Sequence, residues 1–233
     1  AQAAARAPAK AWLFACLRPS FPLDGTLVHM PQSHSQRHDK LMRLLGKLPG
    51  TFRTAHARAL GVDSRAPRDL VDRGLVEQLS RGVYRDAKQP PPSDPDLLVV
   101  AARMPRAVLC LISALALHDL TDEVPHEVHV ALPHGAEPPR LQHPPLRFVR
   151  LRPASFTAGV ELHKVDGVDL RVFGPAKTVA DCLQFRNLVG LDTALAALKA
   201  WCRRRCFDLE ELLHYARVCR VERLTRCYLE AIL

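Results

Sequence analysis

The chain has 233 residues and a formal net charge of +9, so it is long enough for one large domain or for two of ordinary size. Nothing in it approaches the run of about 18 apolar residues that a membrane span requires, so we expect no membrane partner. Its seven cysteines follow no disulfide spacing and mostly fall in helical patterns, which favours buried thiols in a reducing, cytoplasmic compartment.

The positive charge is concentrated toward the N-terminal end. Residues 37–86 carry a clear excess of Lys and Arg, whereas residues 87–200 carry as many acidic as basic side chains. A compact basic segment suits a polyanion such as nucleic acid, and a solvated basic surface is the plainer alternative.

The first predicted segments are an irregular leader over residues 1–35 and a helix over residues 36–48. The leader imitates an export signal, but its apolar patch is about half the usual length and has no small-residue cleavage site. The helix carries leucines at helical spacing and is stopped by Pro49 and Gly50.

Two more helices are predicted before residue 75. Thr51 is a suitable N-cap for a helix that ends at Gly61. Either Asp63 or Ser64 can cap a third helix, which ends at Gly74. A proline in the first turn of this third helix is tolerated there and can shift the start of the helix.

A tight hairpin follows, with strands over residues 75–79 and 82–85. Three helices and a hairpin in this order predict a winged helix-turn-helix domain over residues 36–87, with the third helix in the major groove of DNA and the hairpin as the wing. The residues expected to contact DNA are Ser64, Arg65, Arg68, Asp69, Arg73 and Arg81. The alternative is a winged helix that binds protein rather than DNA.

A proline-rich stretch, KQPPPSDPD, predicts a linker over residues 88–95. Beyond it the sequence predicts helices over residues 96–103 and 106–118, strands within HEVHVALP, LRFVRL and VELHKVDGVDLRVF, and helices from Pro175 to the end. Residues 96–233 are therefore predicted to form a mixed α+β domain with a small sheet and C-terminal helices.

This second domain contains carboxylates of the kind that a metal-dependent nuclease needs: Asp122, Glu123, Glu127, Glu161, Asp166, Asp169 and Asp181. Glu161 and Lys164 superficially resemble a nuclease strand, but their spacing places the two side chains on opposite faces of a strand. Paired zinc-ligand motifs, Gly-rich phosphate loops and nucleophile elbows are absent from the sequence. We therefore predict a protein without catalytic residues, metal or cofactor, with a nuclease-like second domain as the alternative.

Four phrases carry a resemblance to a known family: LSRGVYR, PRAVLCLISALALHDLTDEVPHEVHVALP, VFGPAKTVADCLQFRNLVGLDTALAALKAW and HYARVCRVERLTRCYLEAIL. Over about residues 36–233 the chain resembles the AbiEi family of antitoxin and transcriptional regulator proteins. The resemblance implies a bacterial, cytoplasmic DNA-binding repressor from a toxin–antitoxin or phage-defence cassette. Its partners would be double-stranded DNA, as inverted repeats in its own promoter, and a nucleotidyltransferase-like toxin. An antitoxin of this type IV class need not form a stable complex with its toxin.

The surface that counteracts the toxin is expected within PAKTVADCLQFRN, because this phrase is more polar than capping and packing need. Its candidate residues are Pro175, Lys177, Thr178, Asp181, Arg186 and Asn187. The alternative is an ordinary helix that begins at Pro175 and exposes Lys177 and Asp181 as an i,i+4 pair.

Overall fold

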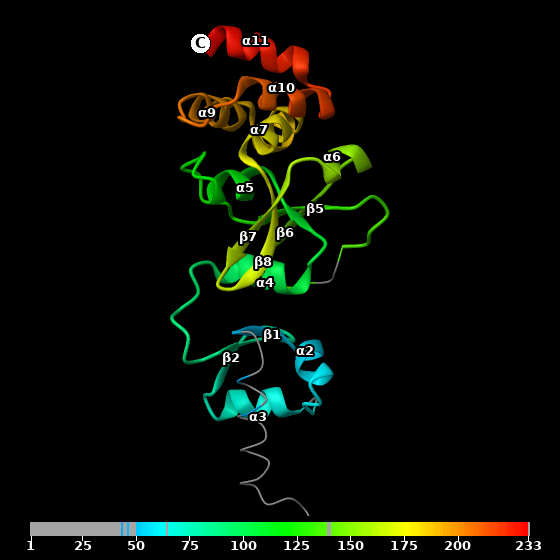
Figure 1. Ribbon diagram of the computed structural model, residues 1–233, viewed down its shortest axis with the longest axis vertical. Coiled ribbons are helices and arrows are strands. Elements are labelled where there is room, and N and C mark those ends of the chain that lie inside the picture. Colours follow the sequence, from blue (N-terminus) through cyan, green and yellow to red (C-terminus); the bar gives the residue numbers. More distant parts are fainter. Residues whose placement is uncertain (1–42, 44–45, 47–49, 64, 139–140, 233) are drawn as a thin grey trace, which may run out of the picture.

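The residues described by the computed structural model are 43, 46, 50–63, 65–138 and 141–232. They form two β-sheets, one of three strands near the N-terminal end and one of five strands further along the chain (Figure 1). The predicted leader and the predicted helix over 36–48 lie outside the described residues, apart from Arg43 and Gly46. The α+β class predicted from the sequence is confirmed. The helices in the described ranges are all too short or too polar to span a membrane.

The N-terminal part, residues 50–86, consists of the smaller sheet and two helices. Its elements are β1 (Thr51–Arg53), α2 (Thr54–Ala59), α3 (Ala66–Asp72), β2 (Val76–Ser80) and β3 (Val83–Asp86). The strands are antiparallel in the order β1-β3-β2, so β2 and β3 form the expected hairpin. Phe52 stacks on Tyr84, and both rings belong to one core with Ala57 of α2 and Leu70 of α3. This core joins both helices to the sheet.

The start of the second helix differs from the prediction. Thr51 is not an N-cap, because it pairs opposite Arg85 of β3, and the helix begins only at Thr54. Threonine suits a strand as well as a cap, and the burial of Phe52 in the core favours the strand. The predicted end is close to the observed one, since Gly61 follows α2 with a φ of +78°.

The C-terminal part, residues 95–232, is built on a mixed sheet in the order β6-β5-β4-β8-β7. Its strands are β4 (Val108–Leu109), β5 (Val128–Leu132), β6 (Leu146–Arg150), β7 (Val160–Val165) and β8 (Val168–Phe173). The central strand β4 runs antiparallel to β5 and parallel to β8. β7 and β8 form a hairpin, and its turn residues Asp166 and Gly167 both have positive φ values, as the tight turn requires.

The predicted helix over residues 106–118 is wrong in its first half. Val108 and Leu109 form β4, and helix α5 spans only Leu111–Leu117. The strand lies between two other strands and the start of the helix is buried among other helices. Neither half therefore shows the alternation of apolar and polar residues that distinguishes a strand from a helix.

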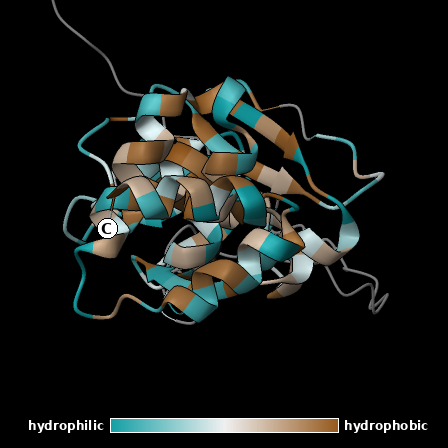
Figure 2. Ribbon diagram, turned by 90° about the horizontal axis from the view of Figure 1, so that it is seen from above, coloured by the Kyte–Doolittle hydropathy of each residue, from teal (hydrophilic) through white to brown (hydrophobic). Residues whose placement is uncertain are grey.

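Helices cover both faces of the five-stranded sheet. Leu109 and Val130 pack on helix α4 (Pro95–Arg103), whereas Val108 and Ala131 pack in the core that contains α5 and α7. The remaining helices are α6 (Pro153–Thr157), α7 (Pro175–Gln184), α8 (Arg186–Val189), α9 (Leu191–Cys202), α10 (Leu209–Val218) and α11 (Glu222–Ile232). Figure 2 shows hydrophobic and hydrophilic residues alternating along the helices at this end, as expected where one side of each helix is buried.

Helix α4 lies between the two sheets (Figure 1). It contacts all three strands of the smaller sheet and strand β8 of the larger one. Asp94 caps α4 by accepting a hydrogen bond from the backbone N–H of Leu97 at 2.9 Å. The connector before it is also tied down, because the backbone N–H of Ser93 donates to the Asp166 carboxylate at 3.3 Å. The two parts of the chain are thus joined by packing as well as by the connector.

Candidate nucleic-acid interface

Helix α3 presents most of the residues that were predicted to contact DNA. Its inner face is anchored by Leu70 and by Pro67, which lies buried in the first turn, where a missing N–H removes no intrahelical hydrogen bond. The Asp63 carboxylate accepts a hydrogen bond from the backbone N–H of Arg65 at 3.0 Å, and the helix begins at the next residue. The predicted residues exposed on or beside α3 are Arg65, Arg68, Asp69 and Arg73. Ser64 lies outside the described residues.

The tip of the wing is the turn at Arg81 and Gly82, and it is held by the start of α2. The Gly82 carbonyl accepts hydrogen bonds from the backbone N–H and the hydroxyl of Thr54, at 3.0 and 3.4 Å. Gly82 has a φ of +79°, and a Cβ there would lie 3.3 Å from Thr54 Oγ1. Glycine is therefore favoured both by the backbone conformation and by the close approach of the threonine.

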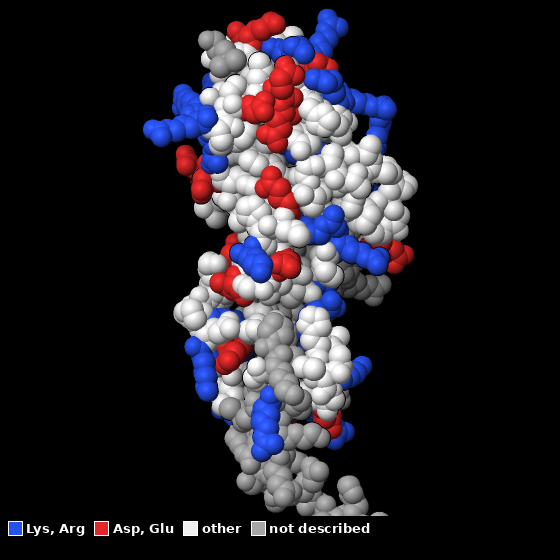
Figure 3. Space-filling view, in the orientation of Figure 1, with Lys and Arg blue, Asp and Glu red and all other residues white. Residues whose placement is uncertain are grey.

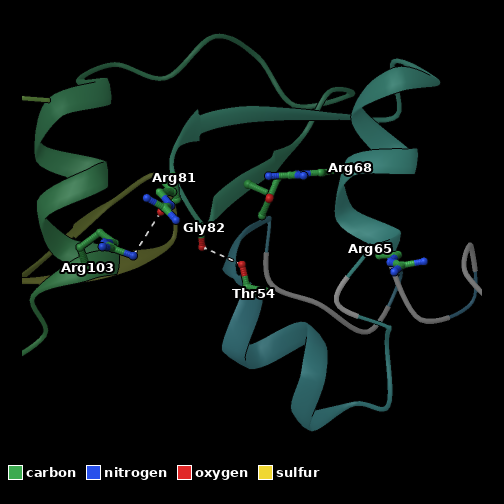
Figure 4. A pocket seen from close by; sticks show the side chains of 7 residues that line it. Thr54, Arg65, Arg68, Arg81, Gly82 and Arg103 are labelled. Atoms are coloured by element: carbon green, nitrogen blue, oxygen red, sulfur yellow. Dashed lines mark hydrogen bonds between the residues drawn. The ribbon is translucent and has the colours of Figure 1, made fainter. Parts of the chain in front are cut away.

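A hollow of about 470 Å³ lies between α3 and the wing (Figure 4). Arg65, the residue before α3, and Arg68 of α3 line one side of it, and Arg81 and Gly82 line it from the hairpin. A further arginine, Arg103, enters from the end of α4 and donates a hydrogen bond from Nη1 to the Arg81 carbonyl at 3.1 Å. The structure thus brings together Arg65, Arg68 and Arg81, while Asp69 and Arg73 do not line this hollow.

The hollow has a strongly cationic lining. A neighbouring hollow of about 260 Å³ shares Arg103, and the arginines that line the two are Arg53, Arg58, Arg65, Arg68, Arg81 and Arg103. Among the residues that the structure describes, none of these six forms an ion pair with a carboxylate. By contrast, basic and acidic side chains lie close together over much of the visible C-terminal part (Figure 3). A group of uncompensated guanidinium ions is a surface suited to phosphate groups.

Nothing in the sequence pointed to Arg103. It lies near the end of a helix that follows the proline-rich connector, where a basic residue is favourable for the helix dipole alone. Its place in the hollow depends on the packing of α4 against the smaller sheet, which is a contact between distant segments. Arg53 and Arg58 carried a weak signal, because they belong to the basic segment of the chain.

The predicted antitoxin surface is corrected by the structure. Lys177, Thr178 and Asp181 are at most 1% exposed, so they are part of the core and do not form a surface. The predicted antitoxin surface and the alternative of an ordinary helix both place the Lys177–Asp181 pair in solvent, and both are wrong on that point. The reason is that α9, α10 and α11 all pack against α7, which leaves it no solvent-facing side over these residues. Of the other predicted members, Asn187 is exposed, and Pro175 and Arg186 are half-buried.

The buried pair belongs to a compact polar network. Lys177 Nζ lies 4.3 Å from the centre of the Phe173 ring, and the Cys219 thiol donates to Asp181 Oδ1 at 3.2 Å. Burial raises the pKa of the Asp181 carboxyl, and the charge and hydrogen bonds of Lys177 oppose that rise. Burial also raises the pKa of Cys219 to about 12, so this thiol stays protonated at neutral pH and is a poor nucleophile.

The carboxylates of the nuclease-like alternative do not converge. In the described part of the chain, no group of three or more His, Cys, Asp or Glu side chains is placed to hold a metal ion. Glu161 Oε2 lies 3.4 Å from His163 Nε2, and the Asp181 carboxylate forms a buried ion pair with Lys177. The alternative therefore has no metal-ligand set among these residues.

Comparisons with known proteins give one family match, which lies in the N-terminal part of the chain. Residues 39–85 match the family model described as transcriptional regulator, AbiEi antitoxin, so the resemblance is confirmed for this segment. Among solved structures, the chain is similar to the crystal structure of RV2827C protein from Mycobacterium tuberculosis, with 16% sequence identity and a TM-score of 0.46. That similarity covers 84% of this chain and 81% of the other. No curated protein matches the chain.

Proposed function

We propose that the protein is a DNA-binding transcriptional repressor and antitoxin that binds inverted repeats in the promoter of its own cassette. The observation that carries DNA binding is the hollow between α3 and the wing, where Arg65, Arg68 and Arg81 lie together without carboxylate partners among the described residues. The match of residues 39–85 to an antitoxin-type regulator supports the same function. The proposed division of the chain is 36–87 for DNA binding, 88–95 for the linker and 96–233 for the antitoxin role.

In this proposal the helix and the wing have different tasks. Arg65 is the N-cap of α3 and Arg68 lies in its first turn, so the two side chains project from neighbouring positions at the start of the helix. With α3 in the major groove, they would contact phosphates or base edges, while Arg81 on the wing would reach an adjacent phosphate. Each neutralised phosphate releases counterions, so the affinity would fall steeply as salt is added.

The test is the binding of the full chain to the duplex upstream of its own gene, measured by fluorescence anisotropy over a salt series. The variant Arg65→Ala/Arg68→Ala/Arg81→Ala removes the arginines of the hollow. Its matched control removes three exposed arginines of the C-terminal part and has the same net charge: Arg152→Ala/Arg203→Ala/Arg205→Ala. We expect the first variant to lose about 100-fold in affinity and about 2.7 from the slope of log K against log salt concentration, and the control to bind like the wild type.

Three outcomes would contradict the proposal. Equal losses in the two variants would show a general effect of charge. An unrelated duplex bound as tightly as the upstream one would argue against a repressor. A wild-type chain that binds no duplex would favour a winged helix that contacts protein.

For the antitoxin role, we place the contact with the toxin at the end of the molecule away from α3 (Figure 1). A hollow of about 390 Å³ lies there, lined by Arg186 of the predicted surface together with Arg220, Arg223 and Leu224. Arg220 and Arg223 form no ion pair within the described residues. A basic hollow with an apolar wall suits an acidic protein surface, through complementary charge and apolar contact.

Protection of cells is the appropriate readout, because a type IV antitoxin need not form a stable complex. Cells would express the nucleotidyltransferase-like protein of the same cassette together with each variant. We expect Arg186→Ala/Arg220→Ala/Arg223→Ala to lose protection and keep DNA binding, and the variant of the α3–wing hollow to do the reverse. Full protection by the Arg186/Arg220/Arg223 variant would overturn this placement.

A further inference from the structure

We propose that Arg103 of α4 is a phosphate-contacting residue of the nucleic-acid interface, so that the C-terminal part completes the DNA site. This inference rests on the proposed DNA binding and adds a residue from outside the predicted winged helix. Arg103 lines both cationic hollows, one shared with Arg65 and Arg68 and the other with Arg53 and Arg58. It is therefore the arginine that the two hollows have in common.

Arg103 has donors to spare for a ligand. A guanidinium group carries five N–H donors in one plane, and among the described residues one of them is used, in the 3.1 Å hydrogen bond to the Arg81 carbonyl. That carbonyl is uncharged, so the positive charge of Arg103 is not neutralised by its partner. The other N–H groups are available to phosphate oxygens, which guanidinium binds in a bidentate manner.

The same hydrogen bond fixes the wing. The carbonyl of Arg81 accepts from Arg103 on α4, and the carbonyl of Gly82 accepts from Thr54 at the start of α2 (Figure 4). The two backbone groups of the tip are thus held by two different helices. The Arg81 side chain then projects from a backbone that is already in place, which reduces the ordering that binding would require.

The position of Arg103 is set by packing. Helix α4 contacts β1, β2 and β3 of the smaller sheet, and it shares a core with β4, β5 and β8 of the larger one. Its C-terminal end, where Arg103 lies, is therefore held against the wing by apolar contacts on both sides of the helix. An interface that includes Arg103 exists only while the two parts of the chain are docked.

The experiment compares three variants of the full chain by anisotropy with the upstream duplex over a salt series. Arg103→Ala removes the charge and the contact to the wing, whereas Arg103→Gln removes the charge and keeps an N–H donor for the Arg81 carbonyl. The control is Arg106→Ala, which removes an exposed arginine three residues further on. We expect both Arg103 variants to lose about one from the salt slope, with an affinity loss of about tenfold that is smaller for glutamine, and the control to match the wild type.

The failures are distinguishable. If Arg103→Ala keeps the wild-type affinity and slope while the Arg65/Arg68/Arg81 variant loses binding, this inference is overturned and the proposed function stands. If Arg103→Ala loses affinity but keeps the slope, Arg103 only positions the wing, and the phosphate contact is overturned. If the wild type itself shows no salt-dependent binding, the proposed function fails first. Circular dichroism of each variant confirms that it is folded.

Discussion

Lys177 Nζ lies 2.5 Å from Asp181 Oδ2, and both side chains are closed off from solvent. Either charge alone would be left uncompensated in an apolar core, which costs about 3–5 kcal/mol. We therefore expect Lys177→Met to lower the free energy of unfolding by about that amount, and Lys177→Met/Asp181→Leu to recover most of the loss. Urea denaturation at pH 7 measures both. Losses that simply add in the double variant would show that the pair does not act as a unit.

Gly159 should tolerate alanine worse than Gly135 does. Both have positive φ values, +66° and +81°, which cost a non-glycine residue about 1–2 kcal/mol. At Gly159 a Cβ would also lie 2.9 Å from Lys177 Cβ and 3.0 Å from the Tyr215 ring, whereas nothing lies within 4 Å at Gly135. We expect Gly159→Ala to destabilise by about 3 kcal/mol and Gly135→Ala by about 1–2 kcal/mol, as measured by urea denaturation. Equal losses would show that the crowding at Gly159 relaxes without cost.

The reactivity of the cysteine thiols should follow their exposure to solvent. Cys206 and Cys227 are exposed, whereas Cys110, Cys182 and Cys219 are buried, and burial raises the pKa of each of these three well above its ordinary value. Among these five cysteines, a native protein treated with iodoacetamide at pH 7.5 should be alkylated at Cys206 and Cys227 before the three buried ones, because the thiolate is the reactive form. Peptide mass spectrometry locates the label. Early alkylation of Cys219 would show that the network around Asp181 opens readily.

Stability should fall in mild acid through His118. Its Nε2 lies 2.7 Å from the Phe173 carbonyl and donates to it, and burial lowers the pKa of the ring below 6.5. The unfolded chain then binds a proton at higher pH than the folded one, so this stability is complete above about pH 6.5 and is lost as the pH falls below it. His118→Gln keeps a donor for the carbonyl and should flatten the decline between pH 7 and 5 in urea titrations. A decline as steep as that of the wild type would assign it to other groups.

Helices and strands whose apolar residues repeat with one clear period were predictable from the sequence. Elements whose secondary structure depends on contacts with distant segments were not. Strands β5 to β8 and helices α7, α9, α10 and α11 lie where the pattern placed them, because their sequences alternate apolar and polar residues or carry an apolar stripe at helical spacing. Val108 and Leu109 were read as helix because they are buried on both faces. Thr51 was read as a cap because the strand opposite it, β3, lies more than 30 residues further on.

The candidate site was predictable only where one local segment supplies it. Arg65, Arg68 and Arg81 follow from the winged-helix pattern, and the structure brings them to one hollow. Arg103 could not be predicted, because its role depends on how α4 docks on another sheet. The polar helix was misread for a related reason: Lys177 and Asp181 resemble an exposed pair in sequence, and only the helices packed over α7 bury them.

The position of α4 between the two sheets has a consequence for the operator spacing that two copies of the chain would recognise. The direction of α3 relative to the C-terminal part is set by the packing of α4 on both sheets as well as by the proline-rich connector. Two copies joined through their C-terminal parts would therefore hold their α3 helices at a single separation, and only operators with matching half-site spacing would fit both. The C-terminal part would then set that spacing, although the residues proposed to contact base edges lie in the N-terminal part.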